Sequence, residues 1–198
     1  MKSFCHTPLR STIVAATICQ IALPAYASID LTPAVSEYTA EGMKFEQLVF
    51  HDNKQRIEYE LPTGWTFDGS ATEFHLKPPQ KNFAEAVIQA LPLSKPQALD
   101  ENTRNDLKQK VIGELPAGSQ FVRVEQEIVN PILLSGRATF EVTVSYQLLG
   151  EKFCRSVLFA NREATQWLFR FTAKKTDFEP LQGEFRRSIL SWHWLKAE

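Results

Sequence analysis

The sequence predicts an α+β fold, in which an antiparallel β-sheet is flanked by helices. Segment 137–148 alternates regularly between apolar and polar residues, as expected of a strand with one buried face. The connections 149–151 and 161–163 are short enough for hairpins, so the strands they join are expected to be antiparallel. Near the C-terminus, apolar residues recur every three or four positions, which indicates a helix that packs on the sheet. These residues are Phe178, Leu181, Phe185, Ile189 and Trp192.

The other strands are expected from similar patterns. Ile57, Tyr59 and Leu61 fall on one face of an expected strand, while charged residues fall on the other. Segment 83–91 is apolar on both faces, which is typical of a strand that is covered on both sides. Glycine and proline predict turns between several of these segments. The expected strands are 45–50, 55–61, 65–67, 72–77, 83–91, 120–129, 137–148, 152–160 and 166–173.

Two helices are expected, one in mid-chain and one near the C-terminus. Asp100 is the expected N-cap of the first helix, and Gly113 and Pro116 bring it to an end. Segment 176–179 matches a capping box at the start of the second helix, and the proline that follows favours Asp177 as the true cap. One face of the first helix is expected to carry residues that recur at every fourth position, namely Leu99, Thr103, Leu107 and Val111.

Residues 1–27 have the pattern of a signal peptide. Lys2 and Arg10 form a positive region, a mostly apolar stretch follows, and segment 25–27 places small residues where a signal peptidase cleaves. The alternative is an uncleaved membrane anchor, but a glutamine and a proline interrupt the stretch, and a spanning helix needs roughly 20 apolar residues. We therefore expect an exported protein, periplasmic or secreted, with no transmembrane segment after cleavage of the leader.

Composition places the mature chain among single-domain globular proteins. Cleavage would leave 171 residues, of which 28–44 are expected to form a polar N-terminal arm and 45–198 a single α+β domain. Hydrophobic residues make up 43% of the sequence and charged residues 23%, which excludes a disordered chain or a membrane protein. The leader holds two of the 22 basic residues, so the mature chain has a formal charge of −3 against 23 acidic residues. We expect no nucleic-acid partner, because such proteins normally show a basic excess.

Cys154 is the only cysteine left after cleavage of the leader, so no intramolecular disulfide is expected. It lies in an expected strand with no activating histidine or lysine directly beside it. A small buried side chain is therefore the favoured interpretation. The alternative is an intermolecular disulfide or a reactive thiol.

The order of these elements resembles the PsbP-like superfamily. Strands are followed by the turn 61–65, a hairpin, a mid-chain helix, long antiparallel strands and a closing helix that begins near 176–179 and ends at Trp192. The superfamily includes the lumenal PsbP subunit of photosystem II, a Ran-binding nuclear transport factor and many uncharacterised exported bacterial domains. The resemblance implies an α/β/α sandwich and a non-enzymatic role in binding or assembly. It implies no metal-ligand pair in this chain.

No catalytic, nucleotide-binding or zinc-binding motif occurs in the sequence, and no cofactor is expected. Glu73 and His75 are two residues apart on an expected strand, so their side chains would share a face. With a third ligand they could hold a divalent metal ion, but a polar outer face is the favoured interpretation, because a metal site normally needs three or four protein ligands. His51 and Asp52 are expected in a tight turn, where aspartate is favoured for backbone reasons.

Two further groups are candidates for binding. Trp65 and Trp194 are the tryptophans least explained by the expected core, so they form a possible partner surface. Trp167 and Trp192 are expected in the core. Polar residues on the expected strands 137–148 and 166–173, together with Lys174, form a face that is either open to solvent or lines a hydrated groove beneath the N-terminal arm. These residues are Thr139, Glu141, Thr143, Ser145, Gln147, Arg170, Thr172 and Lys174.

Together these patterns favour an exported binding or assembly module that is not an enzyme. It would act through contact with another exported protein. The alternative is a carrier of a small ligand or a divalent metal ion that uses Glu73, His75 and the polar sheet face. A hydrolase is the weakest alternative, because it would need a serine and a histidine that meet only in the folded chain.

Overall fold

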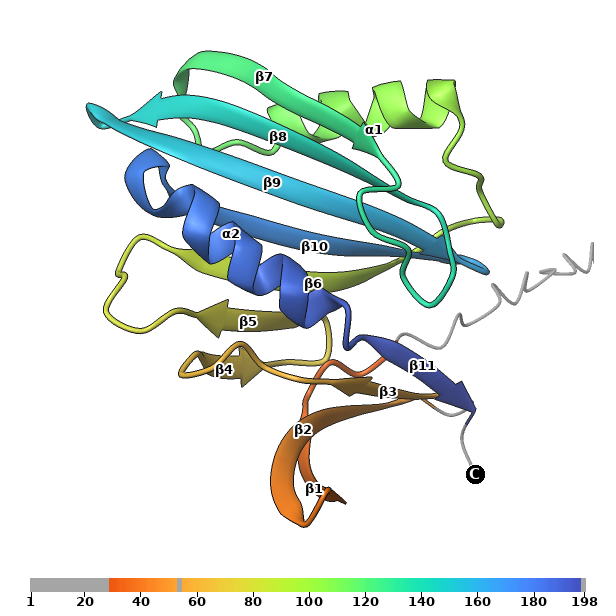
Figure 1. The fold of residues 1–198 in the computed structure, drawn as a ribbon. Coiled ribbons are helices and arrows are strands. Elements are labelled where there is room, and N and C mark those ends of the chain that lie inside the picture. The colour runs from red at the N-terminus through yellow and green to blue at the C-terminus, as the bar shows by residue number, and fades with distance from the viewer. Residues whose placement is uncertain (1–28, 53–54, 197–198) are drawn as a thin grey trace, which may run out of the picture.

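The computed structural model describes residues 29–52 and 55–196, which form two helices and 11 strands (Figure 1). The expected leader, 1–27, lies outside the described residues. All strand pairs are antiparallel, as predicted, and they form two sheets. The larger sheet contains, in spatial order, β4 (Thr66–Gly69), β5 (Glu73–Lys77), β6 (Glu85–Pro92), β10 (Thr165–Lys174), β9 (Glu151–Arg162), β8 (Thr139–Leu148) and β7 (Gln120–Val129).

A smaller sheet lies below β4 in Figure 1, at one edge of the molecule. Two of its strands correspond to the expected segments 45–50 and 55–61, and the other two were not predicted from the sequence. The spatial order is β1 (Ala34–Ala40), β2 (Met43–Asp52), β3 (Gln55–Tyr59) and β11 (His193–Lys196).

The two helices cover opposite faces of the larger sheet, so the fold is the predicted α+β sandwich (Figure 1). Helix α1 spans Glu101–Gly113, and the Asp100 side chain accepts a 2.8 Å hydrogen bond from the backbone N–H of Thr103, which confirms the predicted N-cap. Neither helix of the described chain combines the length and apolar character needed to span a membrane.

Helix α2 spans Lys175–Ile189, so it begins two residues before the predicted cap at Asp177. That prediction is wrong, because Lys174 occupies the cap position and makes no side-chain capping hydrogen bond. Asp177 instead forms a 2.6 Å ion pair with Lys81, which lies in the segment before β6. Its carboxylate still lies in the first turn, where it interacts favourably with the helix dipole.

The apolar face of β8 packs under α1, which differs from the expectation that it lies under the C-terminal helix. Leu107 and Val111 of α1 share a buried cluster with Val142 and Val157 of the sheet. Helix α2 instead covers the opposite face. The buried residues of that second cluster include Phe169, Phe171, Phe178, Phe185, Ile189 and Trp192.

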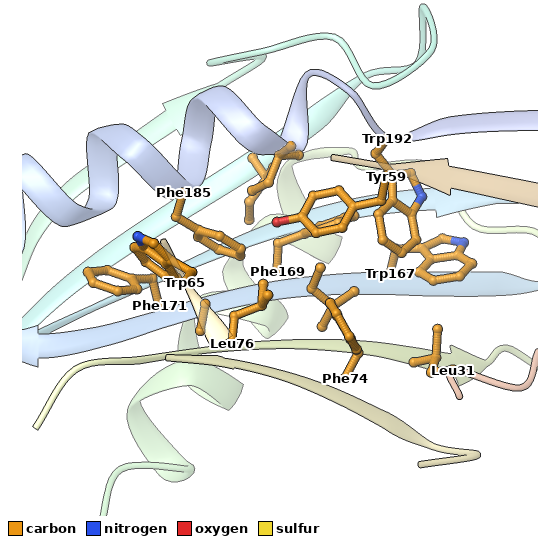
Figure 2. Close-up of a cluster of buried hydrophobic side chains, with 14 of the residues drawn as sticks. Leu31, Tyr59, Trp65, Phe74, Leu76, Trp167, Phe169, Phe171, Phe185 and Trp192 are labelled. Carbon is orange, nitrogen blue, oxygen red and sulfur yellow. The ribbon is translucent and has the colours of Figure 1, made fainter. Parts of the chain in front are cut away.

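Aromatic side chains fill the core between α2, the large sheet and the small sheet (Figure 2). Trp192 is fully buried, and its ring centroid lies 5.2 to 5.5 Å from those of Phe50, Tyr59, Trp167 and Phe169. Trp167 and Trp192 are therefore core residues, as predicted. Because the rings around Trp192 come from β2, β3 and β10, and Trp192 itself lies between α2 and β11, this packing joins the small sheet to the rest of the domain.

Segment 28–44 was predicted as a polar arm without assigned structure, but its described residues join the fold. Residues 34–40 form β1, which pairs with β2. Leu31 is completely buried in the main core. A Cβ atom on Gly69 would lie 2.5 Å from Pro33 and 2.6 Å from the carbonyl oxygen of Leu31, so the segment packs directly against β4.

Candidate functional site

One part of the large sheet is left uncovered on the face that α1 occupies. Cross-strand neighbours on this face are Val157 of β9, Arg170 of β10, Val87 of β6 and His75 of β5. The cluster under α1 centres on β8, β9 and the end of β10. Polar and charged side chains occupy the same face on β5, β6 and the other part of β10.

A cavity of about 560 Å³ lies on this uncovered face, and we name it the basic groove. Its size is within the roughly 300–1,000 Å³ typical of ligand pockets. Four lining residues are basic and one, Glu85, is acidic. The lining consists of Lys77, Pro78, Gln80, Lys81, Asn82, Phe83, Ala84, Glu85, Val87, Pro116, Tyr146, Phe153, Arg155, Arg170 and Thr172.

Arg155 lies deepest among the basic residues of the groove, with 9% of its surface exposed. Its Nε donates to Thr172 Oγ1 at 3.0 Å, and its Nη1 donates to the carbonyl oxygen of Glu114 at 2.9 Å. The guanidinium carbon lies 6.0 Å from the ring centroid of Tyr146. Neutral groups thus hold this cation in place.

Burial lowers the pKa of the Arg155 guanidinium, and the positive charge of Arg170 lowers it further, although Tyr146 and the negative charge of Glu114 act in the opposite direction. Within the described chain, neither arginine forms an ion pair with a carboxylate. Lys81 differs, because it is paired with Asp177. The two arginines therefore hold positive charge at the groove that the surrounding described residues do not neutralise by direct contact.

Aromatic side chains form one wall of the basic groove. The ring centroids of Tyr146 and Phe153 are 5.7 Å apart and nearly parallel, and those of Phe153 and Phe83 are 6.5 Å apart. Phe83 is 63% exposed, and the ammonium of Lys174 lies 4.7 Å from its ring centroid. The groove therefore offers an apolar surface beside its positive charges.

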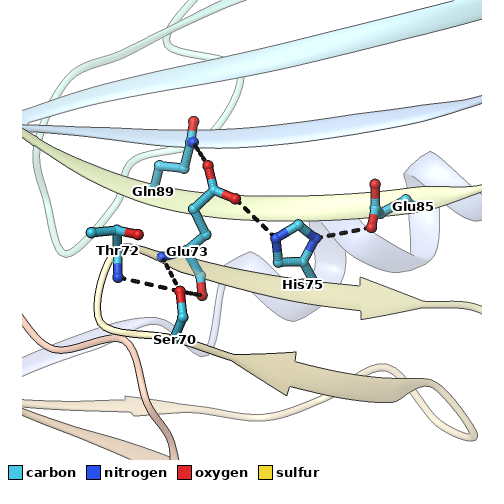
Figure 3. Close-up of polar contacts among 6 residues, drawn as sticks. All are labelled: Ser70, Thr72, Glu73, His75, Glu85 and Gln89. Atoms are coloured by element: carbon cyan, nitrogen blue, oxygen red, sulfur yellow. Dashed lines mark hydrogen bonds and ion pairs between the residues drawn. The ribbon is translucent and has the colours of Figure 1, made fainter.

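A hydrogen-bonded array on β5 and β6 borders the basic groove (Figure 3). His75 Nε2 lies 3.0 Å from Glu73 Oε2, and His75 Nδ1 lies 2.9 Å from Glu85 Oε1. Gln89 donates to the other carboxylate oxygen of Glu73. Glu73 and His75 share a face, as predicted, and His75 also engages the single acidic residue of the groove.

The pKa of His75 is raised above its ordinary value. Partial burial opposes the charged ring, but the hydrogen bonds and negative charges of Glu85 and Glu73 together outweigh it. In residues 29–52 and 55–196, no group of three His, Cys, Asp or Glu side chains is arranged to hold a metal ion. Both ring nitrogens of His75 already have carboxylate partners, which suits an ion-pair network rather than a metal ligand.

The predicted polar face is not one surface, and this corrects both interpretations offered for it. Arg170 and Thr172 face α1, whereas Glu141 and Thr143 face α2. Thr139, Glu141 and Thr143 are buried rather than open to solvent. Glu141 lies beneath α2, not beneath the N-terminal segment, and accepts hydrogen bonds from Ser156, Gln182 and Arg186.

Trp65 does not provide the expected partner surface, because it is 5% exposed and packs against Phe171 and Phe185. Its indole Nε1–H donates to Glu184 at 3.0 Å, which satisfies the polar end of the ring. Trp194 is only partly buried. It lies in β11, with its ring 5.9 Å from that of Trp167 and 5.0 Å from the guanidinium of Arg162.

The remaining candidates are structural or isolated. Cys154 is buried, as predicted, and burial raises its pKa. His51 and Asp52 end strand β2 instead of lying in a turn. Among the residues that the structure describes, the His51 ring takes part in no metal-ligand group.

The sequence prediction missed the basic groove because its lining comes from several separate segments. Arg170 and Thr172 had been noted, but they were placed with residues of the opposite face. Arg155 offered one signal, since a charged residue in the middle of a largely apolar strand is seldom buried without a role or a partner. Whether a residue of β10 lies on the same face of the sheet as a given residue of β8 depends on how both strands pair with β9. The alternation of apolar and polar residues alone does not determine that pairing.

The antiparallel sheet with one helix on each face defines a PsbP-like fold, as predicted. The sequence matches no family model and no curated protein. Among solved structures, LpqN, which is involved in cell envelope biogenesis of Mycobacterium tuberculosis, aligns with a TM-score of 0.51 at 13% identity and covers 84% of this chain and 92% of its own.

Cyanobacterial PsbP from Synechocystis aligns with a TM-score of 0.50 at 9% identity, over 81% of this chain and 92% of its own. A Pseudomonas aeruginosa protein of unknown function aligns with a TM-score of 0.43 at 13% identity, over 79% of this chain and 94% of its own. The alignments with LpqN and cyanobacterial PsbP show similarity of fold. Because the identities are this low, function has to be argued from the site.

Proposed function

We propose that this chain is an exported binding module, not an enzyme, and that it contacts another exported protein through the basic groove. The observation that carries the proposal is the pair Arg155 and Arg170, whose charges face a groove on the uncovered part of the sheet. Burying charge without a carboxylate partner lowers stability. A binding role explains why such an arrangement is retained.

Export is supported by the sequence pattern of residues 1–27 and is consistent with the fold's occurrence in LpqN, a protein of cell envelope biogenesis. In the part of the chain that the structure describes, no arrangement favours catalysis over binding. In the titratable cluster beside the groove, both ring nitrogens of His75 are engaged by the carboxylates of Glu73 and Glu85. We therefore assign the cluster a structural role in setting the charge at the groove's edge.

The test is capture of partners from the exported fraction of the native host by immobilised mature protein, residues 28–198. Two charge reversals are compared with the wild type. Lys77→Glu changes an exposed residue of the groove. Lys95→Glu is the matched control, because Lys95 is also exposed and lies beyond the end of β6, about 20 Å from the groove at the strand's start.

A stoichiometric protein partner that is retained by Lys95→Glu and lost by Lys77→Glu supports the proposal. Capture that is equal for all three proteins would place the partner elsewhere and overturn the assignment to the groove. Turnover of a substrate by the purified protein, if abolished by a single substitution near the groove, would overturn the non-enzymatic role.

A further inference from the structure

The chemistry of the basic groove narrows the kind of partner that fits it. Arg155 is fixed by Thr172 and by the Glu114 carbonyl oxygen, so its guanidinium is held in one orientation before any ligand arrives. Both acceptors are neutral and leave its charge in place. Prior ordering of this kind reduces the entropy lost on binding.

Two carboxylates lie near the arginines, and neither forms an ion pair with them. Glu114, whose charge raises the pKa of Arg155, lies 3.9 Å from the ammonium of Lys110. Glu85 lines the groove, but its Oε1 is engaged by His75 at 2.9 Å. The raised pKa of His75 means that this ring carries positive charge over a wider pH range than a free histidine. With Lys77 at the rim, the groove therefore presents an excess of positive charge to an incoming ligand.

The shape of the site favours a narrow chain over a flat surface. Arg155 is 9% exposed and lies at the floor, so a bilayer surface resting on the protein would not reach it. An extended peptide can insert single side chains into a recess of this volume. The exposed ring of Phe83 meets Phe153 edge to face, and Phe153 stacks on Tyr146, so the three rings provide an apolar surface next to the charges.

We propose that Arg155 and Arg170 form the anion-binding floor of the basic groove and that its occupant is an acidic segment of a partner protein. Two neighbouring carboxylates of that segment face the arginines, and an adjacent apolar side chain lies on Phe83 and Phe153. Guanidinium groups match carboxylates through paired hydrogen bonds. This inference rests on the proposed function, and it adds the chemical class of the partner.

The experiment uses the mature folded protein, labelled with nitrogen-15, and follows amide shifts during titration. The main probe is the capped peptide Glu-Glu-Phe, and its matched control is Gln-Gln-Phe. Inorganic phosphate and phosphatidylglycerol vesicles are titrated separately. Wild type is compared with Arg170→Gln, and Arg137→Gln serves as the control variant because Arg137 is exposed near the opposite end of β8 from Tyr146.

The expected result is saturable shifts around β9, β10 and Phe83 with the acidic peptide and none with its amide control. Arg170→Gln should weaken binding about tenfold or more, since it removes a charge-assisted hydrogen bond, while Arg137→Gln should not. Raising the salt concentration should weaken binding as well. Arg155→Lys provides a second variant, which keeps the positive charge but loses the planar guanidinium and its paired N–H donors.

Equal shifts with both peptides, or shifts unchanged in Arg170→Gln, would overturn the inference. Binding of phosphate or of anionic vesicles without binding of the acidic peptide would overturn it too, in favour of a phosphate group or a lipid headgroup. Peptide binding without any exported partner would contradict the proposed function alone. A partner whose capture survives Arg170→Gln would contradict this inference alone.

Discussion

Arg186 of α2 forms an ion pair with Glu141 of β8, whose side chain is only 4% exposed. Ser156 and Gln182 also donate hydrogen bonds to the same carboxylate. The ion pair therefore fastens α2 to β8, the strand next to the edge of the large sheet, through a buried charge. Arg186 itself is 35% exposed, so only one partner is removed from water.

The first prediction concerns the loss of this cation. Arg186→Met should lower the free energy of unfolding by about 2 kcal/mol, because it leaves the buried Glu141 carboxylate without its counter-charge. Arg187→Met, on the exposed side of the same helix, should change it by less than about 0.5 kcal/mol. Chemical denaturation measures both, and equal losses would show that the ion pair contributes nothing specific.

A double substitution checks that prediction. If Arg186 acts through Glu141, then Arg186→Met should cost less in a Glu141→Gln background than in the wild type, with a coupling energy of about 1 kcal/mol. Additive losses would mean that Arg186 stabilises the protein by packing its methylene groups instead.

The second prediction concerns pH and His75. The folded pKa of His75 is raised, so its interaction with Glu73 and Glu85 contributes fully below the unfolded pKa of about 6.5. That contribution is lost as the pH rises through the folded pKa. The difference in free energy of unfolding between wild type and His75→Gln should therefore be larger at pH 6 than at pH 9, because the ring interacts with the two carboxylates as a cation only while it is protonated. NMR titration of the ring should also show a lower pKa in Glu85→Gln.

The third prediction compares two glycines. Gly69→Ala should destabilise the protein by about 1–3 kcal/mol, because the new methyl group would overlap Pro33 and the Leu31 carbonyl oxygen. Gly183→Ala should stabilise it by about 0.5–1 kcal/mol, since Gly183 is within α2 and nothing lies within 4 Å of the added atom. Thermal denaturation separates the two, and shifts of the same sign would contradict the packing of the N-terminal segment.

The fourth prediction concerns Cys154. Burial raises the pKa of its thiol, and the side chain is 6% exposed, so little thiolate is accessible to reagents at neutral pH. Iodoacetamide should alkylate the native protein at least about tenfold more slowly than the protein unfolded in urea. Rapid native labelling would revive the alternative of a reactive or intermolecular thiol.

Most elements of the larger sheet could be predicted from the sequence because they depend on local patterns. The alternation in β8 and the cap at Asp100 each involve residues a few positions apart. The face of the sheet on which each helix lies depends instead on distant pairings, such as Val142 with Val157. The basic groove was missed for the same reason. Lys77 and Arg155 line the same groove only because β5, β6, β10 and β9 lie side by side in the sheet.

Strands β1 and β11 illustrate a second limit. Segment 34–40 is largely exposed and lacks a regular apolar pattern, and its pairing with β2 is made by backbone hydrogen bonds that leave little trace in the sequence. Residues 193–196 follow a helix and form a strand only because β3 offers a free edge. In both cases the tertiary partner, not the local pattern, determines the element.

The last prediction tests whether the described N-terminal segment is part of the domain. Leu31 is completely buried against the main core, although it lies in a stretch without periodic pattern. Leu31→Ala should therefore lower the free energy of unfolding by about 2–4 kcal/mol, through lost burial and the cavity left behind.

Val35→Ala is the matched control, because Val35 lies four residues later and is 58% exposed. It should change the free energy of unfolding by less than about 0.5 kcal/mol. A small effect for Leu31→Ala would show that the segment binds loosely and that the domain begins at β2. A large effect would place the start of the folding unit before β1, because a residue that is loosely attached contributes nothing to global stability.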